Sequence, residues 1–151
     1  MIKILRDNFE IIKQEGLGIA NHLKVDDWRS DDWYIAPLKI EDEDKDVFTQ
    51  EQLDNFRAQA PITFKLTEEV NAIASAFSVL KAHSSIKSHT HDNAYCTWAL
   101  TLQAEDSYII TNGVRLPFTE GEFTTFDYRP AHEVHNESDI DRVVLLVLKH
   151  L

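Results

Sequence analysis

The chain has 151 residues, of which 43% are hydrophobic and 10% aromatic, and its formal net charge is −11 at pH 7. This length and composition fit one folded domain over residues 1–151 that is large enough to bury a core. The acidic excess argues against a nucleic-acid partner, because phosphate binding requires clustered Lys and Arg side chains. The single cysteine, Cys96, excludes an internal disulfide. Because the longest apolar run, residues 143–148, is too short to cross a bilayer, we expect a cytoplasmic protein with no membrane partner.

The N-terminal part, residues 1–75, is predicted to be helical and mixed in structure. Apolar residues recur at roughly helical spacing near the start of the chain, although Gly16 and Gly18 weaken the middle of that pattern. The charged run over residues 41–46 is interpreted as a solvated loop. The predicted elements are a helix over residues 6–24, a strand over 33–40, a helix that begins at Thr49, and a helix over 64–77 with Leu66, Val70 and Ile73 on one face.

Residues 76–151 consist of short segments rich in β-branched and aromatic residues. Turn signals separate these segments at Asp92-Asn93, Asn112-Gly113 and Glu120-Gly121, and the Asn-Gly pair is a strong hairpin signal. About seven closely spaced strands after a helical start predict a mainly β fold with N-terminal helices. We therefore expect residues 76–151 to form the core of an antiparallel barrel or two-sheet jelly roll, with the helices packed outside it.

Two groups of histidines stand out in this second part. His89 and His91 are two residues apart, so on a strand both side chains leave the same face. His132 opens a second group, and a third imidazole from another strand would complete a mononuclear metal site. His135 is expected to face the other way on an extended segment. The alternative is that these are surface histidines that cluster by chance; the remaining histidines, His22, His83 and His150, are interpreted as surface or satisfied residues.

Arg142 begins the most apolar strand of the chain. An arginine in that position either caps the rim of the barrel or points into it toward an anionic ligand, and its planar fork suits a carboxylate. The alternative is a surface ion pair with Asp139 or Asp141.

The residues of the second half resemble the aspartyl/asparaginyl β-hydroxylase-like family of Fe(II)/2-oxoglutarate oxygenases, which includes proline hydroxylases and belongs to the cupin superfamily. The most specific part of the resemblance is a pattern formed by Glu120-Gly121, Phe126-Asp127, His132-Glu133-Val134, Asn136 and Arg142. The resemblance implies a double-stranded β-helix, a cupin-like jelly roll, in which His89 and His132 hold iron. It also implies that Arg142 pairs with the far carboxylate of 2-oxoglutarate, and that oxidative decarboxylation of this cosubstrate drives hydroxylation of an unactivated C–H bond.

The chain departs from the family pattern at two places. Where the proline-hydroxylase branch has a metal-binding carboxylate, two residues after the first histidine, this chain has His91, which is a candidate third ligand or faces a substrate. Where the aspartyl-hydroxylase branch has an arginine and a histidine that help hold the cosubstrate, this chain has Thr97 and Ala99. Thr97 offers one hydroxyl to the cosubstrate and Ala99 offers nothing.

The sequence therefore predicts a hydroxylase that uses Fe(II) and 2-oxoglutarate on an amino acid or a peptide side chain, so that its partner is a small-molecule or peptide substrate. One alternative is a three-histidine cupin, a metal-binding protein or dioxygenase that does not use 2-oxoglutarate. Another is a family member with no catalytic role, because a fold alone does not fix function. Five aromatic residues are candidates for the mouth of the site, with ordinary core packing as the alternative: Trp28, Trp33, Tyr34, Phe118 and Tyr128.

Overall fold

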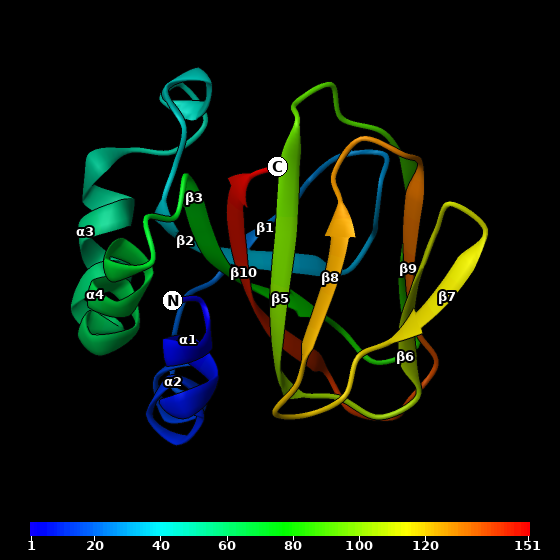
Figure 1. The fold of residues 1–151 in the computed structure, drawn as a ribbon, viewed down its shortest axis with the longest axis horizontal. Helices are drawn as coiled ribbons and strands as arrows, with labels where there is room; N and C mark the ends of the chain where they lie inside the picture. The colour runs from blue at the N-terminus through cyan, green and yellow to red at the C-terminus, as the bar shows by residue number, and fades with distance from the viewer.

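A computed structural model describes all residues from 1 to 151. Two antiparallel sheets face one another, and the α-helices lie to one side of the larger sheet (Figure 1). In chain order the elements are α1 (Lys3–Asp7), α2 (Phe9–Leu17), β1 (Leu23–Lys24), β2 (Trp33–Lys39), the short 3-10 helix η1 (Asp42–Asp44), α3 (Gln50–Gln59), α4 (Pro61–Glu69), β3 (Ala74–Leu80), β4 (Ser84–His89), β5 (Tyr95–Gln103), β6 (Ser107–Thr111), β7 (Val114–Pro117), β8 (Phe123–Asp127), β9 (His132–Asn136) and β10 (Arg142–His150).

The strand order identifies the fold as a jelly roll. The larger sheet has the order β1-β2-β3-β10-β5-β8, and the smaller has the order β4-β9-β6-β7. All pairings are antiparallel, and the two sheets do not close into one continuous barrel. The predicted fold class, a mainly β double-stranded β-helix with N-terminal helices, is confirmed. Strands β1 and β2 also show that the N-terminal part adds strands to the larger sheet.

The strands of the larger sheet alternate between two environments, as a period of two requires. Phe77, Leu100 and Leu145 point toward the helices and belong to the larger hydrophobic cluster, together with Ile12 and Phe56 from the helices. Side chains of the opposite parity face the smaller sheet and line the space between the two sheets. The helices therefore stabilise the larger sheet from outside and leave its inner face available for a site.

Both long helical predictions extend too far at their C-terminal ends. The helix predicted over residues 6–24 is broken into α1 and α2 at Asn8 and ends at Leu17, before Gly18, and Leu23 lies in strand β1. The helix predicted over residues 64–77 ends at Glu69, because Asn71 adopts a left-handed backbone with φ of 58°. In each case the helix ends near a residue type that is common at helix C-termini, Gly18 or Asn71, although the apolar periodicity continues beyond it.

Two local sequence signals are confirmed. Thr49 caps helix α3 through a capping box, in which its hydroxyl accepts from the backbone N–H of Gln52 at 3.1 Å and the Gln52 side chain accepts from the backbone N–H of Thr49. Asn112 and Gly113 form the β6–β7 hairpin turn with φ of 51° and 75°, which is the requirement of a two-residue type I′ turn. No helix of the structure is both long enough and apolar enough to span a bilayer.

Candidate metal centre and ligand cavity

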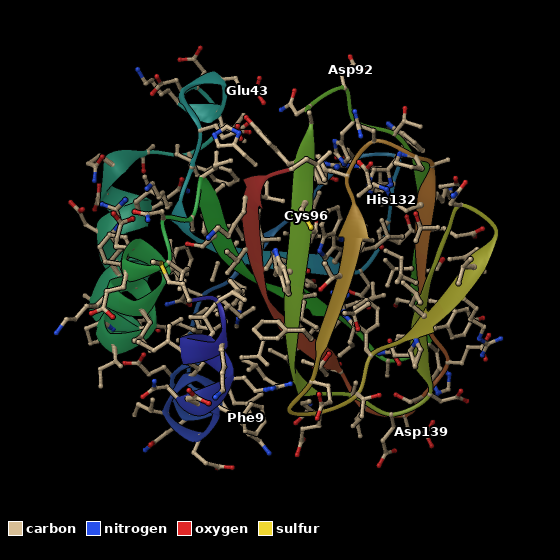
Figure 2. All side chains as sticks on the ribbon, in the orientation of Figure 1. Phe9, Glu43, Asp92, Cys96, His132 and Asp139 are labelled. Carbon is tan, nitrogen blue, oxygen red and sulfur yellow. The ribbon has the colours of Figure 1, made fainter.

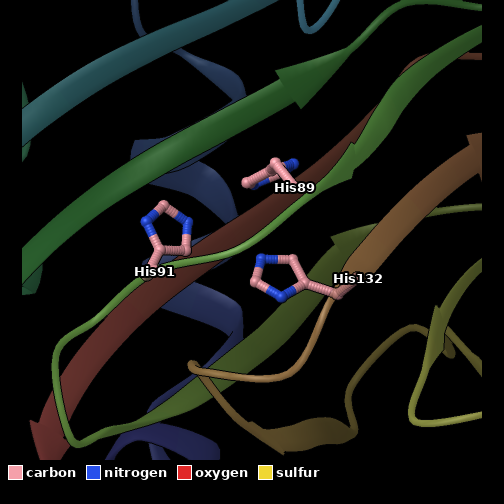
Figure 3. Close-up of side chains that lie close together, drawn as sticks. All are labelled: His89, His91 and His132. Atoms are coloured by element: carbon pink, nitrogen blue, oxygen red, sulfur yellow. The ribbon is translucent and has the colours of Figure 1, made fainter.

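Three histidines from the two groups singled out in the sequence come together between the sheets. His89 ends strand β4, His132 begins strand β9, and the two residues are register partners. His91 lies two residues beyond the end of β4, so a loop, rather than strand parity, brings its ring to the other two. The available nitrogens of the three rings all lie within 4.8 Å of one another. Figure 3 shows the three rings facing a common point.

Backbone carbonyls orient two of these rings. The Nδ1–H of His89 donates to the carbonyl of Lys87 at 2.7 Å, and the Nδ1–H of His132 donates to the carbonyl of Pro130 at 2.9 Å. A carbonyl can only accept, so the proton of each neutral ring sits on Nδ1 and the lone pair on Nε2. A hydrogen bond of this kind to the non-ligating nitrogen is the usual way in which a protein fixes a metal-binding histidine.

The environment keeps all three imidazoles neutral. Burial lowers the pKa of His89 and of His132, and burial together with the neighbouring His89 lowers the pKa of His91 to about 4. A metal ion requires the neutral ring, because the protonated ring has no free lone pair. The three rings are therefore in the ligating state at neutral pH.

The donor set fits a metal ion. Three neutral imidazoles suit Fe, Zn, Cu and Ni, so the ligand type does not select among these metals. No carboxylate joins the three histidines, because Asp92 is exposed and Asp27, the carboxylate near His89, is paired with Arg29 at 2.7 Å. This arrangement differs from the two-histidine, one-carboxylate set of many non-haem iron oxygenases.

Arg142 is the second unusual group of the interior. Its side chain is 3% exposed and points inward, with one guanidinium N–H donating to the hydroxyl of Ser78 at 2.9 Å. The guanidinium lies over the ring of Phe118 at 4.8 Å, and its Nε atom has no hydrogen-bond partner. Burial lowers the pKa of Arg142 to about 9, so the group remains charged at neutral pH. A buried cation without a carboxylate is strongly disfavoured unless a ligand supplies one.

The ion-pair alternative for Arg142 is wrong. Asp139 and Asp141 are both engaged elsewhere, with His83 at 2.6 Å and with Lys81 at 3.2 Å respectively. Of the two orientations that the sequence left open for this arginine, the structure shows the inward one.

A cavity of about 240 Å³ joins the three histidines to Arg142. Thr97 and Ala99 on strand β5 both line it, and the Thr97 hydroxyl is buried without a hydrogen-bond partner. Of the aromatic residues expected near the mouth, the cavity is lined by Trp33, Phe118 and Tyr128. The two others do not line it: Trp28 is 63% exposed, and Tyr34 packs against the larger hydrophobic cluster, between the larger sheet and the helices.

Two contacts of the site carry no signal in the sequence, although Trp33 and Tyr128 were themselves candidates for its mouth. Ser78 accepts hydrogen bonds from both Arg142 and the indole of Trp33, the latter at 2.8 Å. Tyr128 stacks on His91 with 3.7 Å between ring centroids. Both contacts join distant strands, and no local pattern marks them. Among the other histidines, His83 and His150 are exposed as expected, whereas the Nε2 of His22 is buried without a partner.

A two-sheet jelly roll with histidines gathered between its sheets is the architecture of cupin-type proteins. The sequence profile of the family described as aspartyl/asparaginyl beta-hydroxylase matches residues 2–149. The chain therefore belongs to the aspartyl/asparaginyl β-hydroxylase family, and the resemblance noted in the sequence is confirmed. No individual curated protein sequence matches the chain.

A solved structure supports the fold assignment. The Cnp3 cupin domain of Schizosaccharomyces pombe superposes with a TM-score of 0.56 at 9% identity, over 89% of this chain and 72% of that one. A predicted oxalate decarboxylase from Thermotoga maritima has a TM-score of 0.47 at 22% identity, over 58% of this chain and 74% of that one. The superposition on the Cnp3 domain shows that the chain shares the cupin fold, and its 9% identity carries no information about the reaction.

Proposed function

We propose that the protein is a hydroxylase that uses Fe(II) and 2-oxoglutarate. The observation that carries the proposal is the pairing of two features in one cavity: three neutral histidines, and a buried Arg142 whose guanidinium has no carboxylate partner. Membership of the hydroxylase family also supports the proposal that the protein is a hydroxylase. The substrate class expected from that family is an amino acid or a peptide side chain.

In this proposal each group of the site has a separate task. His89 and His132 hold the metal through Nε2, and His91 is the third nitrogen donor. Arg142 binds the far carboxylate of 2-oxoglutarate, with the Ser78 hydroxyl fixing the guanidinium from the side. When bound, the iron and the cosubstrate supply the oxidising chemistry, while the apolar walls exclude water from the reacting groups.

A second candidate function is that of a three-histidine cupin that does not use 2-oxoglutarate. The observation that favours it is the donor set, since no carboxylate joins the three histidines and Thr97 and Ala99 line the cavity where the family has further cosubstrate contacts. In that case Arg142 binds a carboxylate of the substrate itself, and the metal site acts without a cosubstrate.

An anaerobic Fe(II) titration with and without 2-oxoglutarate separates these functions. The proposal predicts a visible metal-to-ligand charge-transfer band only when both are present. Arg142→Met is expected to weaken 2-oxoglutarate binding by about 100-fold or more, which corresponds to about 3 kcal/mol, while iron still binds. Arg115→Met, on the exposed strand β7, is the matched control and should leave the band unchanged.

Two results would contradict the proposal. Iron binding without a charge-transfer band at any 2-oxoglutarate concentration would favour the three-histidine cupin. A band with undiminished 2-oxoglutarate affinity in Arg142→Met would show that this arginine does not bind the cosubstrate.

A further inference from the structure

Some of the charged side chains that line the cavity have an ion-pair partner within the chain, and others do not. Apart from the neutral histidines there are four: Arg29, Lys39, Asp44 and Arg142. Arg29 is held by the carboxylate of Asp27 at 2.7 Å, and Lys39 pairs with Glu68 at 3.3 Å. The side-chain carboxylate of Asp44 has no ion-pair or hydrogen-bond partner, and the Arg142 guanidinium donates only to a hydroxyl. The cavity therefore presents one cation and one anion that the protein itself leaves uncompensated.

The uncompensated anion lies in a concentrated group of negative charge. Ligand oxygens of Glu41, Glu43 and Asp44 lie within 4.8 Å of one another. Tyr95 donates a hydrogen bond to Glu41, and Asn93 donates one to Glu43 at 3.2 Å, so Asp44 is the carboxylate left without a donor. Burial and the neighbouring Glu43 raise the pKa of Asp44, which shows that a negative charge there is destabilised until a cation approaches.

The two uncompensated groups lie far apart along the cavity. Arg142 begins β10, whereas Thr97, which also lines the cavity, pairs with Leu148 six residues further along that strand. Six residues of strand span about 20 Å. Tyr95, one step beyond Thr97 on the same face of β5, reaches the acidic group through Glu41. Figure 2 likewise shows Glu43 at one end of the molecule and Asp139, which precedes β10, at the other.

The acidic group of Glu41, Glu43 and Asp44, of which Asp44 lines the cavity, forms its rim. The wall between this rim and the interior is apolar, and other parts of the chain do not cover it. On the inner face of the larger sheet, Ala76, Leu146 and Leu148 are only half-buried, although their outward-facing neighbours Phe77 and Val147 are fully buried. All three line the cavity, together with Ile40 and Phe48 near Asp44. An aliphatic chain that lies on this wall would remove it from water.

Polar groups inside the cavity show that it is built to receive a ligand. Thr97 is 2% exposed and lines the cavity, and its hydroxyl has no hydrogen-bond partner. The Nε atom of Arg142 is likewise buried without a partner. Native proteins rarely leave such atoms unsatisfied, so a ligand or water inside the cavity is expected to bond to them. The acidic rim is therefore one end of a ligand cavity, rather than an isolated patch of surface charge.

We propose that the substrate carries an aliphatic chain that ends in an ammonium group, with Asp44 binding the ammonium at the rim and the chain lying along Leu148 and Leu146 toward the histidines. The inference rests on the proposed function in one respect: Arg142 binds the cosubstrate, so Asp44 is the charged group that binds the substrate. Asp44 is a specificity-determining residue in this arrangement. The ammonium group belongs to a free aliphatic amine or to the side chain of a peptidyl lysine.

The test is a binding measurement on the chain of residues 1–151, treated with a chelator so that no metal can hold the amine nitrogen. The probes are pentylammonium, 1-pentanol and pentanoate, which share one chain and differ in charge, followed by the propyl to hexyl ammonium series. We expect pentylammonium to bind about tenfold more tightly than 1-pentanol, and each added methylene to improve binding about fourfold. Nα-acetyl-lysine amide and its neutral counterpart Nα-acetyl-norleucine amide test the peptidyl source.

Variants locate the binding group. Asp44→Asn should abolish the preference for pentylammonium over 1-pentanol, whereas Asp46→Asn, an exposed change in the same segment, should retain it. Equal binding of the ammonium and the alcohol to the unmodified chain, or preferential binding of pentanoate, would overturn the proposal without any variant. An ammonium preference that survives in Asp44→Asn would also overturn it.

These outcomes are independent of the test of the proposed function. A charge-transfer band without an ammonium preference would leave the hydroxylase standing and remove the amine substrate. An ammonium preference without the band would retain the amine ligand and favour the three-histidine cupin.

Discussion

The ring of Tyr128 lies flat against the imidazole of His91, with 3.7 Å between the ring centroids and 7° between the ring planes. Tyr128 follows strand β8, whereas His91 is in the loop after β4, so the contact joins the two sheets. No backbone carbonyl holds the Nδ1 of His91 as carbonyls hold those of His89 and His132. Stacking on Tyr128 is therefore what positions the ring of the third histidine.

Removing that ring should weaken metal binding without removing a ligand. We expect Tyr128→Leu to lower the affinity for Zn(II) or Fe(II) by about tenfold, the lower end of the range for residues that orient metal ligands. Tyr128→Phe keeps the stacked ring and should bind the metal as the unmodified protein does. Calorimetric titration of the two variants measures the difference. Equal losses in both would show that the hydroxyl, rather than the ring, matters.

Replacing His91 itself tests whether it is a ligand. His91→Ala should reduce metal affinity by more than about 100-fold, the upper end for a residue that only orients ligands. His135→Ala is the matched control, because His135 faces away from the site and bonds to Glu133 at 2.8 Å. An unchanged affinity in His91→Ala would mean that this ring faces the substrate and that two histidines hold the metal.

The parts of the site that the sequence predicted are those set by regular spacing along the chain. Strand parity correctly separates His132 from His135, which lie on opposite faces of β9, and places Thr97 and Ala99 together on the inner face of β5. The family pattern supplied the inward role of Arg142, which local spacing alone left open. The inferences about the histidines and about Thr97 and Ala99 each depend on one segment and its period, whereas the inference about Arg142 depends on the family pattern.

The parts that the sequence did not predict depend on contacts between segments. The acidic run over residues 41–46 was interpreted as a solvated loop, and its composition does not indicate that Asp44 lines the cavity. Strand parity predicts that His91 shares a face with His89, but His91 lies beyond the end of β4, and a loop brings its ring to the site. Nothing in the sequence distinguishes Ser78, because its hydrogen bond to Arg142 forms only when β3 and β10 pair. Such roles become visible only in the folded chain.

Asn136 shows how a residue of the family pattern can act through structure alone. Its buried side-chain amide donates to the carbonyls of Leu80 and Ile140 at 3.0 and 2.9 Å, which ties the turn before β10 to the end of β3. Asn136→Ala should lower the free energy of unfolding by about 3 kcal/mol, since buried carbonyls lose their donor. Denaturant unfolding measures this loss. Ser85→Ala, an exposed change on the adjacent strand β4, should stay within about 0.5 kcal/mol.

Gly16 illustrates a glycine that packing requires. A Cβ atom at this position of helix α2 would lie 2.5 Å from Leu102 Cδ1 and 2.8 Å from Phe77 Cε1, so the helix could not approach the sheet as closely. Gly16→Ala gains helix propensity but overpacks this contact, and we expect a net loss of about 1–2 kcal/mol in the free energy of unfolding. Glu10→Ala, on the exposed face of the same helix, should be nearly neutral. A stabilised Gly16→Ala variant would contradict the close contact.

The neutral histidines make the metal-free protein sensitive to acid. The folded-state pKa of His91 is about 4 and those of His89 and His132 are also lowered, whereas the unfolded chain has ordinary values near 6.5. Between pH 6.5 and 4 the unfolded chain therefore binds more protons, and the free energy of unfolding should fall as the pH falls through that window. Above pH 6.5 these residues contribute no pH dependence, because they are neutral in both states.

Denaturant unfolding of the metal-free chain at a series of pH values measures this effect. His91→Gln removes the most strongly shifted of the three groups, so its stability should decline less steeply between pH 6.5 and 4 than that of the unmodified chain. His83→Gln is the control, because His83 is exposed and pairs with Asp139 away from the cavity. A decline of equal slope in the His91→Gln variant would show that His91 takes up protons as readily in the folded chain as in the unfolded one. It would then not belong to the cluster of neutral histidines.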